Sequence, residues 1–468
     1  MKLRSKLAIL LLAGLFAPHR LPVARSAEPP DLGTRKKGVD WPKFLGPTGD
    51  SKSTETGLIT NWPPDGPRLV WQMKLGTGYC MPAISRGRAF VFDRVGKECR
   101  LRCVESETAK PIWESTYATD YEDNFSYDTG PRSSPVVDED RVYTFGPEGT
   151  LRCVSVVDGT ELWKIDTADK FHVIQNFFGV GSTPVVEGDL LIVLIGGSPA
   201  DSHPIAPDRL DQVKGNGCGI VAFDKRTGAI KYQITDELAS YASPTLATIG
   251  GRRWCFVFAR SGLVAFEPST GKIDFQYPWR AKDLYSVNAS TPVVTGDTVF
   301  VSESYEIGSS LLKVRPGAFD LLWKDPASIR AEKAMRLHWN TPVVIDGYLY
   351  GSTGRHTDPA ELRAIELATG KVKWSQPGLG RCSLLNVEGH FVSLGENGRV
   401  QLLKVNPEKF DVVADFVPKD KEAPQVAGTD PPELLQYPAW AAPILSHGLL
   451  YVRGKDRLAC FEVIRDGK

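Results

Sequence analysis

The sequence lacks an excess of charge of either sign. Its 468 residues include 56 lysines and arginines against 56 aspartates and glutamates, so the formal net charge is zero. A chain that binds nucleic acid or an anionic membrane mainly by electrostatic attraction carries a basic surplus. We therefore expect no nucleic-acid partner and no general attraction to a membrane surface.

Sequence motifs of catalysis are also lacking. The seven histidines are scattered along the chain, and there is no nucleophile elbow, phosphate-binding loop or His-Glu-x-x-His zinc motif. The eight cysteines include no Cys-x-x-Cys pair, no haem-attachment motif and no two adjacent cysteines. From these absences we predict no catalytic residue and no metal site, and we favour a protein that is not an enzyme.

Long apolar runs are missing except near the N-terminus, where "LAILLLAGLFA" follows three basic residues. A membrane span takes about 20 residues, so this run of 11 makes an uncleaved anchor the weaker interpretation. A basic start, an apolar stretch and then small residues, here Ala24 and Ser26, are typical of a secretion signal. We predict a signal peptide at residues 1–26 and an exported protein, periplasmic or secreted, with no membrane span after cleavage.

What fills the chain is a repeated strand–turn–strand phrase, seen in "SSPVVDEDRVYTF", "STPVVEGDLLIVL" and "NTPVVIDGYLYGS". The phrase opens at Pro82, Pro135, Pro184, Pro244, Pro292, Pro342 and Pro443, and an eighth copy has Leu384 in place of the proline. A third strand, a turn such as "KRTGA" and a fourth strand follow in every copy but the last. Four short antiparallel strands at this spacing describe one blade of a β-propeller.

The fourth strand of each copy carries an aromatic residue. These residues are Trp113, Trp163, Tyr232, Phe275, Trp323 and Trp374, with Val413 in the weak copy. Because repeated residues serve the repeat, we expect these rings to pack between neighbouring blades, with each N–H bonded to a backbone acceptor. Contact with a cofactor is the less favoured interpretation.

The last copy ends after three strands, and "PRLVWQMKLG" near the N-terminus supplies the missing fourth, with Trp71 at the aromatic position. An N-terminal strand that completes the last blade removes two open sheet edges. We therefore predict an all-β chain: an eight-bladed β-propeller of four-stranded antiparallel blades over residues 68–468, closed by an N-terminal strand. Residues 27–67 are predicted to form an extended arm packed across its surface.

Three cysteines occupy equivalent strand positions in three repeats: Cys103, Cys153 and Cys460. Apolar residues flank each of them, a setting in which cysteine acts as a small hydrophobe. Equivalent positions in different blades do not face one another, whereas a disulfide needs Cα atoms within about 7 Å. We predict that these thiols are buried and unpaired.

The segments "AFDKRTGAIKY", "AIELATGKVKW" and "SVVDGTELW" resemble the repeat of PQQ-like propellers, the quinoprotein alcohol dehydrogenase-like family, which includes assembly factors of the BamB type. The resemblance covers roughly residues 68–465 and implies the propeller fold. It also implies an alternative function, a dehydrogenase of alcohols or sugars that uses PQQ and calcium, with Asn288, Glu303 and Asn340 as separate candidate calcium ligands. Such dehydrogenases typically place adjacent cysteines above the quinone, and BamB-type proteins carry a lipid-attachment cysteine. This sequence has neither, so we predict no cofactor and no membrane tether.

A binding site is expected where the segments leading into the innermost strands ring one mouth of the channel. Polar and aromatic residues break the repeat in these segments and in the matching loop of the sixth blade. The predicted binding residues are Tyr79, Arg132, Asn288, His338, Trp339, Asn340, Arg355, His356 and Trp440. Hydrogen bonding between neighbouring loops would explain the same residues without a ligand.

Two loops are further candidates for the site. One is the long insertion "GGSPADSHPIAPDRLDQVKGNGCG", and the other is the acidic approach to the second blade, with Asp120, Asp123 and Asp128. Together these features predict a monomeric binding scaffold that takes a protein partner or a small carbohydrate-like ligand at the channel mouth without turnover. A polysaccharide lyase or hydrolase acting at the acidic loop is the third interpretation.

Overall fold

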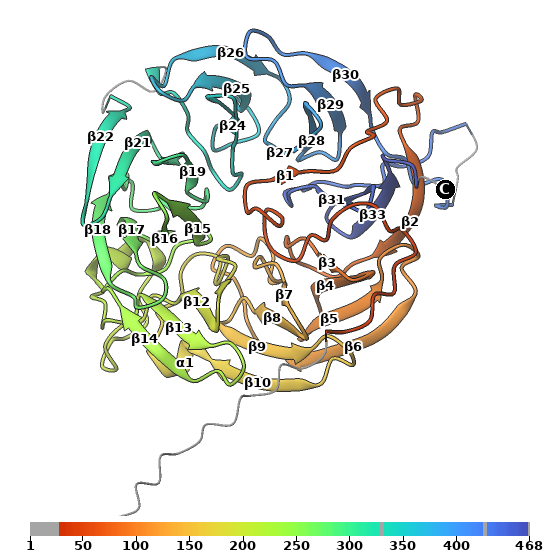
Figure 1. Ribbon diagram of the computed structural model, residues 1–468. Coiled ribbons are helices and arrows are strands. Elements are labelled where there is room, and N and C mark those ends of the chain that lie inside the picture. Colours follow the sequence, from red (N-terminus) through yellow and green to blue (C-terminus); the bar gives the residue numbers. More distant parts are fainter. Residues whose placement is uncertain (1–27, 327–331, 425–427, 467–468) are drawn as a thin grey trace, which may run out of the picture.

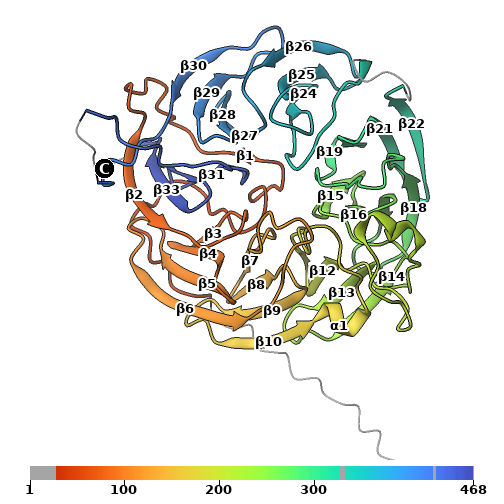
Figure 2. The same cartoon turned by 180° about the vertical axis from the view of Figure 1, so that it is seen from behind.

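The computed structural model describes residues 28–326, 332–424 and 428–466. In this part of the chain, eight β-sheets follow one another around a ring (Figure 1). Seen from behind, the same sheets radiate from a central axis (Figure 2). The predicted fold, an all-β propeller of eight four-stranded blades, is confirmed. The predicted signal peptide lies outside the described residues, and no helix within them is long and apolar enough to cross a membrane.

Each blade runs from an inner strand at the axis to an outer strand at the rim. Blade 1 contains β3 (Ala83–Ser85), β4 (Arg88–Val95), β5 (Glu98–Glu105) and β6 (Pro111–Ala118). Blade 2 contains β7 (Val136–Asp138), β8 (Arg141–Phe145), β9 (Thr150–Ser155) and β10 (Glu161–Asp166). Blade 3 contains β11 (Val185–Glu187), β12 (Leu190–Leu194), β13 (Ile220–Asp224) and β14 (Ile230–Ile234). Blade 4 contains β15 (Thr245–Ile249), β16 (Arg252–Phe258), β17 (Gly262–Phe266) and β18 (Ile273–Pro278).

The other half of the ring has the same plan. Blade 5 contains β19 (Val293–Thr295), β20 (Thr298–Glu303), β21 (Gly308–Arg315) and β22 (Ala318–Lys324). Blade 6 contains β23 (Val343–Ile345), β24 (Tyr348–Thr353), β25 (Glu361–Glu366) and β26 (Val372–Pro377). Blade 7 contains β27 (Cys382–Val387), β28 (His390–Gly395), β29 (Val400–Lys404) and β30 (Val412–Phe416). Blade 8 contains β31 (Ile444–Ser446), β32 (Leu449–Arg453), β33 (Arg457–Glu462) and β2 (Arg68–Lys74).

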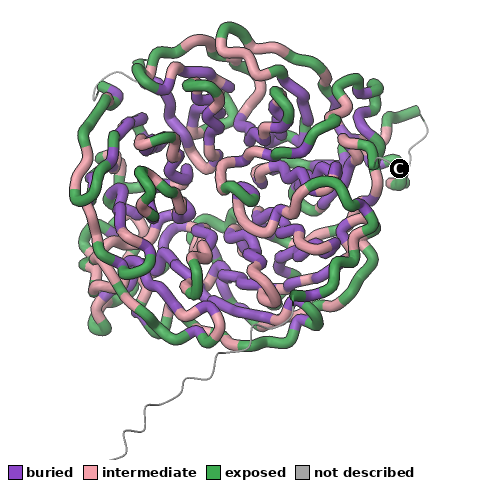
Figure 3. Tube along the Cα trace, viewed as in Figure 1, coloured by how far each residue is buried: buried purple, intermediate pink, exposed green. Residues whose placement is uncertain are grey.

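Between the strands of the described ranges lie two short helices, α1 (Thr167–Phe171) and a 3-10 turn at Pro207–Gln212. The core lies between the blades rather than in one central mass. Strands such as β4 and β17 are buried along nearly their whole length, whereas the outer strands alternate between exposed and half-buried residues (Figure 3). Blades therefore pack face to face through their middle strands, and their outer strands face solvent along the rim.

The ring closes as the sequence predicted. Strand β2, from the N-terminal part of the chain, pairs antiparallel with β33, and Trp71 lies opposite Cys460. Trp71 is buried, and its indole N–H donates to the carbonyl of Ser106 in blade 1 at 3.0 Å. The N-terminal strand thus completes blade 8 and also fastens it to blade 1.

The repeated aromatic residues pack between blades, as predicted. Their N–H or O–H groups donate to a carbonyl of the next blade over 2.6 to 3.2 Å, as in Trp113 to Val156, Trp163 to Lys225, Tyr232 to Pro268, Trp323 to Leu367 and Trp374 to Asn406. For Trp113 of blade 1, a glycine in the β9–β10 turn of blade 2 is part of this contact. Gly159 has φ +72°, and a Cβ there would lie 2.5 Å from the Trp113 ring. Glycine is needed both for the turn and for the approach of the ring.

The weak copy departs from the prediction by one residue. Ala414, not Val413, takes the aromatic position, because it lies opposite Leu402 beside a β-bulge just as Trp374 lies opposite Ala364. Trp62 of the N-terminal segment packs edge-on against Phe416 of the same blade, with ring centroids 5.5 Å apart. The same bulge precedes the aromatic position in other blades, so it does not explain the difference. The prediction of Val413 was wrong because the connection between the third and fourth strands is longer in this copy, from Lys404 to Val412, than in blade 6, from Glu366 to Val372.

All eight cysteines are free thiols, and Cys103, Cys153 and Cys460 are buried. Burial raises the pKa of Cys103 to about 12 and that of Cys153 to about 11. A thiol reacts through its thiolate, so these residues are poor nucleophiles at neutral pH. The prediction of buried, unpaired thiols is confirmed.

The N-terminal arm, described here as residues 28–67, does more than cross the surface. It crosses the face opposite the starts of the inner strands, and a two-residue strand, β1 (Lys52–Ser53), pairs in parallel with β27. Blade 7 therefore has a fifth strand at its inner edge (Figure 1). Nearby, Trp41 pairs with Ile84 of blade 1, and the carbonyl of Pro42 accepts the N–H of Val137 in blade 2.

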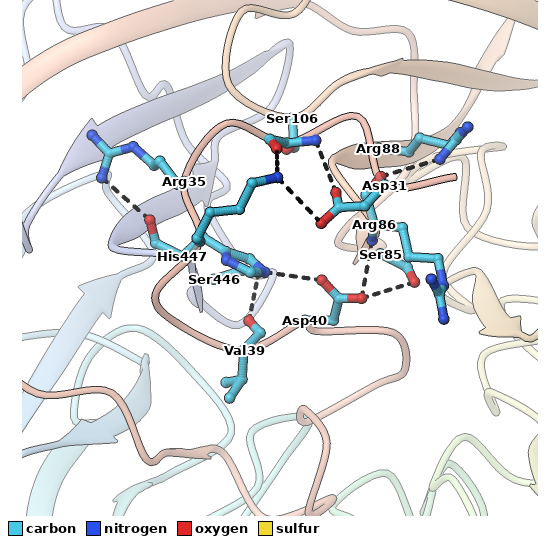
Figure 4. Close-up of polar contacts among 12 residues, drawn as sticks. Asp31, Arg35, Val39, Asp40, Ser85, Arg86, Arg88, Ser106, Ser446 and His447 are labelled. Carbon is cyan, nitrogen blue, oxygen red and sulfur yellow. Dashed lines mark hydrogen bonds and ion pairs between the residues drawn. The ribbon is translucent and has the colours of Figure 1, made fainter. Parts of the chain in front are cut away.

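A polar cluster holds the arm where it passes blades 8 and 1 (Figure 4). One oxygen of Asp40 lies 3.0 Å from Nε2 of His447, and its other oxygen accepts from Ser85 and from the N–H of Arg86. Glu55 accepts three backbone N–H groups, including that of His447 at 2.7 Å. The arm is therefore held by charge-assisted hydrogen bonds as well as by its buried tryptophans.

The His447 contact is expected to make arm docking depend on pH. Nδ1 of His447 faces the carbonyl of Lys37 and Nε2 faces Asp40, so the imidazolium form satisfies both acceptors. The hydrogen bond to Asp40, with the charges of Asp40 and Glu55, raises the pKa of His447 above its usual value. A raised folded-state pKa gives stabilisation that is complete below the unfolded value of about 6.5 and is lost as pH rises through the folded value.

We expect limited proteolysis to cut the arm faster at pH 9 than at pH 6, after correction for protease activity on an unfolded peptide. The His447→Gln variant is the control, because its rate should not change across this window. The pKa of Asp40 is lowered, since its hydrogen bonds and the charge of His447 outweigh burial, so its own titration lies at lower pH. Equal pH dependence in the wild type and in His447→Gln would contradict the assignment.

Candidate functional site

A cavity of about 890 Å³ opens at the mouth formed by the loops that lead into the inner strands. It is lined by side chains from all eight blades and from the arm. Eight of the nine predicted binding residues line it, namely Tyr79, Arg132, His338, Trp339, Asn340, Arg355, His356 and Trp440. The ninth, Asn288, is buried behind the wall, where its amide donates to the carbonyls of Ala259, Arg260 and Trp279. Asn288 therefore has the role given by the alternative interpretation, which is hydrogen bonding between neighbouring loops without a ligand.

A ring of hydroxyl groups forms the inner wall of the cavity. It consists of Ser134, Thr183, Ser243, Thr291 and Thr341, each directly before the proline that precedes an inner strand. The N–H groups of Ser134, Thr183, Ser243 and Thr291 each donate to the hydroxyl of the equivalent residue in the next blade, as Thr183 does to Ser243 at 2.9 Å. These bonds join successive blades around the axis, so the wall is built on fixed backbone. The Ser/Thr-Pro pattern was the sequence signal for this ring.

The arm contributes to the same cavity. Phe44, Leu45 and Ser51 line it, although the arm is anchored at the opposite ends of the inner strands. Lys43 lies among the charges of Glu187 and Arg253 from blades 3 and 4, and burial lowers its pKa. The segment around Lys43 thus reaches across the axis and supplies part of the inner end of the cavity.

Two of the three cavity arginines are already bonded within the protein. Arg381 donates to Glu396 through Nε and Nη2 at 2.9 and 2.6 Å, and through Nη1 to the carbonyl of Arg355. Burial alone would raise the pKa of Glu396, but the hydrogen bonds and charge of Arg381 hold it below its usual value. Arg132 donates to the carbonyls of Phe178 and Asp128 and approaches Asp123 at 3.4 Å. Their positive charges are therefore compensated.

Arg355 is less constrained. Its Cζ lies 4.1 Å from the centre of the Tyr305 ring, and its Nη1 is 3.7 Å from Asp283, with both side chains about one-third exposed. A pair this open to solvent contributes little to stability. Arg355 therefore keeps donor groups for contacts within the mouth.

Tyr305 and His338 form a neutral pair in the wall, with the hydroxyl 3.4 Å from Nε2. Burial and the charges of Arg381, Arg355 and His356 lower the pKa of His338 to about 3. Burial raises the pKa of Tyr305 to about 12. A general acid or base works best with a pKa near the working pH. This pair is thus suited to hydrogen bonding and poorly suited to proton transfer.

Aromatic rings form a continuous belt around the mouth, which we call the aromatic belt. Its members in order are Tyr285, Phe177, Phe125, Phe178, Tyr127, Trp440 and Trp339, and successive ring centroids are 5.7 to 6.3 Å apart. Tyr79 and Tyr437 add to it beside Trp440, at 4.9 and 6.0 Å. Contact at these distances makes one extended apolar surface rather than separate rings.

The site prediction missed much of this belt. Phe125, Phe177, Phe178, Tyr285 and Tyr437 all line the cavity, as does Arg381. All are in loops that approach an inner strand, and none recurs from blade to blade. That combination, a non-repeating aromatic in an approach loop, was the signal available in the sequence.

The acidic residues of the approach to blade 2 shape the site without lining it. Asp123 accepts the N–H groups of Phe125, Tyr127 and Asp128 at 2.7 to 3.1 Å, which fixes the turn that presents the two rings. Its carboxylate is thereby occupied. The long insertion, residues 196–219, contributes no residue to the cavity. Neither candidate loop therefore offers its acidic groups to the mouth.

The geometry defines an eight-bladed propeller with one aromatic cavity at a channel mouth, and comparison with known proteins places it in a family. The family model described as outer membrane protein assembly factor BamB matches residues 56–198 and 101–376. These overlapping matches cover more than half of the chain, so the chain belongs to this family of PQQ-like propellers. No curated protein matches the sequence.

Solved structures show the same fold at low identity. BamB from Moraxella catarrhalis is 13% identical, with 84% of this chain and 97% of that one covered and a TM-score of 0.54. A quinohemoprotein alcohol dehydrogenase from Comamonas testosteroni is 12% identical, with 92% and 81% covered and a TM-score of 0.61. At such identity the likeness concerns the fold alone.

The cavity residues do not fit a quinone held with calcium. Calcium takes six to eight oxygen ligands, and the only carboxylate among the described lining residues is Asp358. Of the calcium candidates, Glu303 is fully buried and accepts from Ser286 and from the N–H of Tyr305. Nowhere in the described part of the chain do three or more His, Cys, Asp or Glu residues gather as a metal site.

Proposed function

We propose that this protein is an exported binding propeller whose aromatic cavity holds a ligand without chemical turnover. The observation that carries the proposal is the cavity of about 890 Å³ at the channel mouth, with exposed rings on its rim and hydrogen-bonded walls. A concave, mostly apolar pocket with a few convergent polar groups is the usual form of a ligand site. Rigid strand ends position such a ligand better than mobile loops.

The chemistry of the lining favours binding over catalysis. Of its titratable groups, His338 and Tyr305 have pKa values of about 3 and about 12, far from neutrality in opposite directions. Glu303, whose pKa burial raises to about 7, does not line the cavity. Asp358 is the one carboxylate among the described lining residues, so the lining supplies few of the oxygen ligands that calcium takes. Binding needs neither a group that titrates near neutrality nor a set of calcium ligands, whereas dehydrogenase activity needs them. The lining therefore supports binding.

The test uses the native protein purified from its source. Intact-mass and absorbance measurements should show a chain that begins after residue 26 and carries no retained quinone. After incubation with PQQ and calcium, alcohols and sugars should give no sustained dye reduction. Sustained turnover that disappears in Trp339→Ala, but persists in the outer-strand variant Leu322→Ala, would overturn the proposal.

A further inference from the structure

The exposed aromatic residues are concentrated at this one place. Four aromatic side chains are exposed in the described part of the chain: Phe125, Tyr127, Tyr285 and Tyr437, at 47, 64, 46 and 51%. All four line the cavity, and they come from three different approach loops. The other exposed large hydrophobic side chains are aliphatic, and many of them lie on the outer strands. Because these exposed rings gather on one rim and are not buried in the core, they mark a binding surface.

The tyrosines of the mouth present unused hydroxyl groups beside apolar ring faces. The hydroxyls of Tyr79, Tyr127, Tyr285 and Tyr437 make no hydrogen bond to a described residue, whereas that of Tyr241 accepts the N–H of Phe178. A tyrosine of this kind offers a flat apolar surface and a polar tip at once. The matching ligand has flat C–H faces edged by hydroxyl groups.

The arginine charges of the mouth are balanced within the protein. Arg381 is paired with Glu396, Arg132 with Asp123, and Arg355 with Asp283. Asp358, which is exposed, is the remaining charged side chain of the lining and forms no ion pair with a described residue. Burying an ionic ligand group without a compensating charge is costly. The balance favours a ligand without net charge.

From these three features we infer that the cavity binds a neutral oligosaccharide; this inference rests on the proposed function. The sugar rings stack on the aromatic belt, their hydroxyls bond to the tyrosine hydroxyls and Arg355, and the hydroxyl ring bounds the inner end. The belt continues over seven rings from Tyr285 to Trp339. Its length suits several linked sugar units better than a single one.

The experiment measures binding of the full-length mature protein to four sets of probes by calorimetry: neutral oligosaccharides, uronic-acid oligosaccharides, sulfated oligosaccharides and short peptides. We expect binding to neutral oligosaccharides that strengthens with chain length. Tyr127→Ala should weaken it about 5- to 10-fold, since one stacked ring is lost, and Tyr127→Phe should weaken it less. Arg355→Gln should change it by less than about threefold, the loss of roughly one hydrogen bond in partly exposed surroundings. Leu322→Ala, an exposed outer-strand variant, is the matched control and should bind as the wild type does.

Preference for the acidic or sulfated oligosaccharides, with loss of binding in Arg355→Gln, would overturn the inference and assign an anionic ligand. Preference for peptides, or no binding to any neutral oligosaccharide, would overturn it as well. These outcomes differ from quinone-dependent turnover, which would contradict the proposed function itself.

Discussion

Deletion of residues 1–75 is expected to lower the free energy of unfolding by more than about 3 to 5 kcal/mol, the usual cost of losing one large buried aromatic. The deletion removes β2, exposes the edge of β33 and takes away the buried rings of Trp41, Trp62 and Trp71. It also breaks the bond from Trp71 to blade 1. Urea denaturation followed by fluorescence and circular dichroism would measure the loss.

Two controls separate ring closure from loss of the arm. Deletion of residues 1–27 should leave the unfolding midpoint unchanged. The point variant Trp71→Ala should lose about as much stability as Trp113→Ala, roughly 3 to 5 kcal/mol each, because both rings bond across a blade interface. If the longer deletion unfolds at the same midpoint as the wild type, β2 does not close the ring.

The second large effect is expected at the buried ion pair of the cavity wall. Arg381 and Glu396 have side chains only 9% and 1% exposed, so Arg381→Met leaves a buried carboxylate without its cation. Breaking such a pair on one side costs about 3 to 5 kcal/mol. The indole N–H of Trp440 donates to the same carboxylate at 3.1 Å. We therefore expect lower stability and also a displaced Trp440, seen as a shifted tryptophan emission.

The double variant Arg381→Met with Glu396→Gln is the matched control. It removes both charges, so it should recover a large part of the stability lost in the single variant. It should not fully restore the emission of Trp440, because the charge-assisted bond to the indole is gone. Equal stability of the wild type and Arg381→Met would show that the pair is not buried as described.

The architecture could be predicted because a propeller repeats locally. Strand partners such as β8 and β9 are neighbours in sequence. The prolines before the inner strands, the turn glycines and the repeated aromatic positions therefore identify the strands of each blade. Even the non-local step, the pairing of β2 with β33, followed from counting strands. Finer register did not follow: Ala414, not Val413, takes the aromatic position of blade 7, because the connection between the third and fourth strands is longer there than in blade 6.

The candidate site could be predicted only in part. The rule that approach segments ring one mouth brought Tyr79, Trp339 and Trp440 together, although they are far apart in the sequence. It failed for Asn288, since a polar residue in an approach loop can turn inward to bond its neighbours. The acidic loop was misjudged for the same reason, because Asp123 bonds its own turn.

The sequence by itself determined the eight blades, the closing strand, the packed aromatics and the buried thiols. Each depends on the repeat unit, in which every strand has a fixed position and a fixed neighbour. Only the tertiary structure decided which side chains share the cavity. The aromatic belt joins loops of blades 2, 3, 5, 6 and 8 around the axis, and the arm adds Phe44 to the inner end. Such contacts follow from loop conformation and ring closure, and no periodic pattern in the sequence records them.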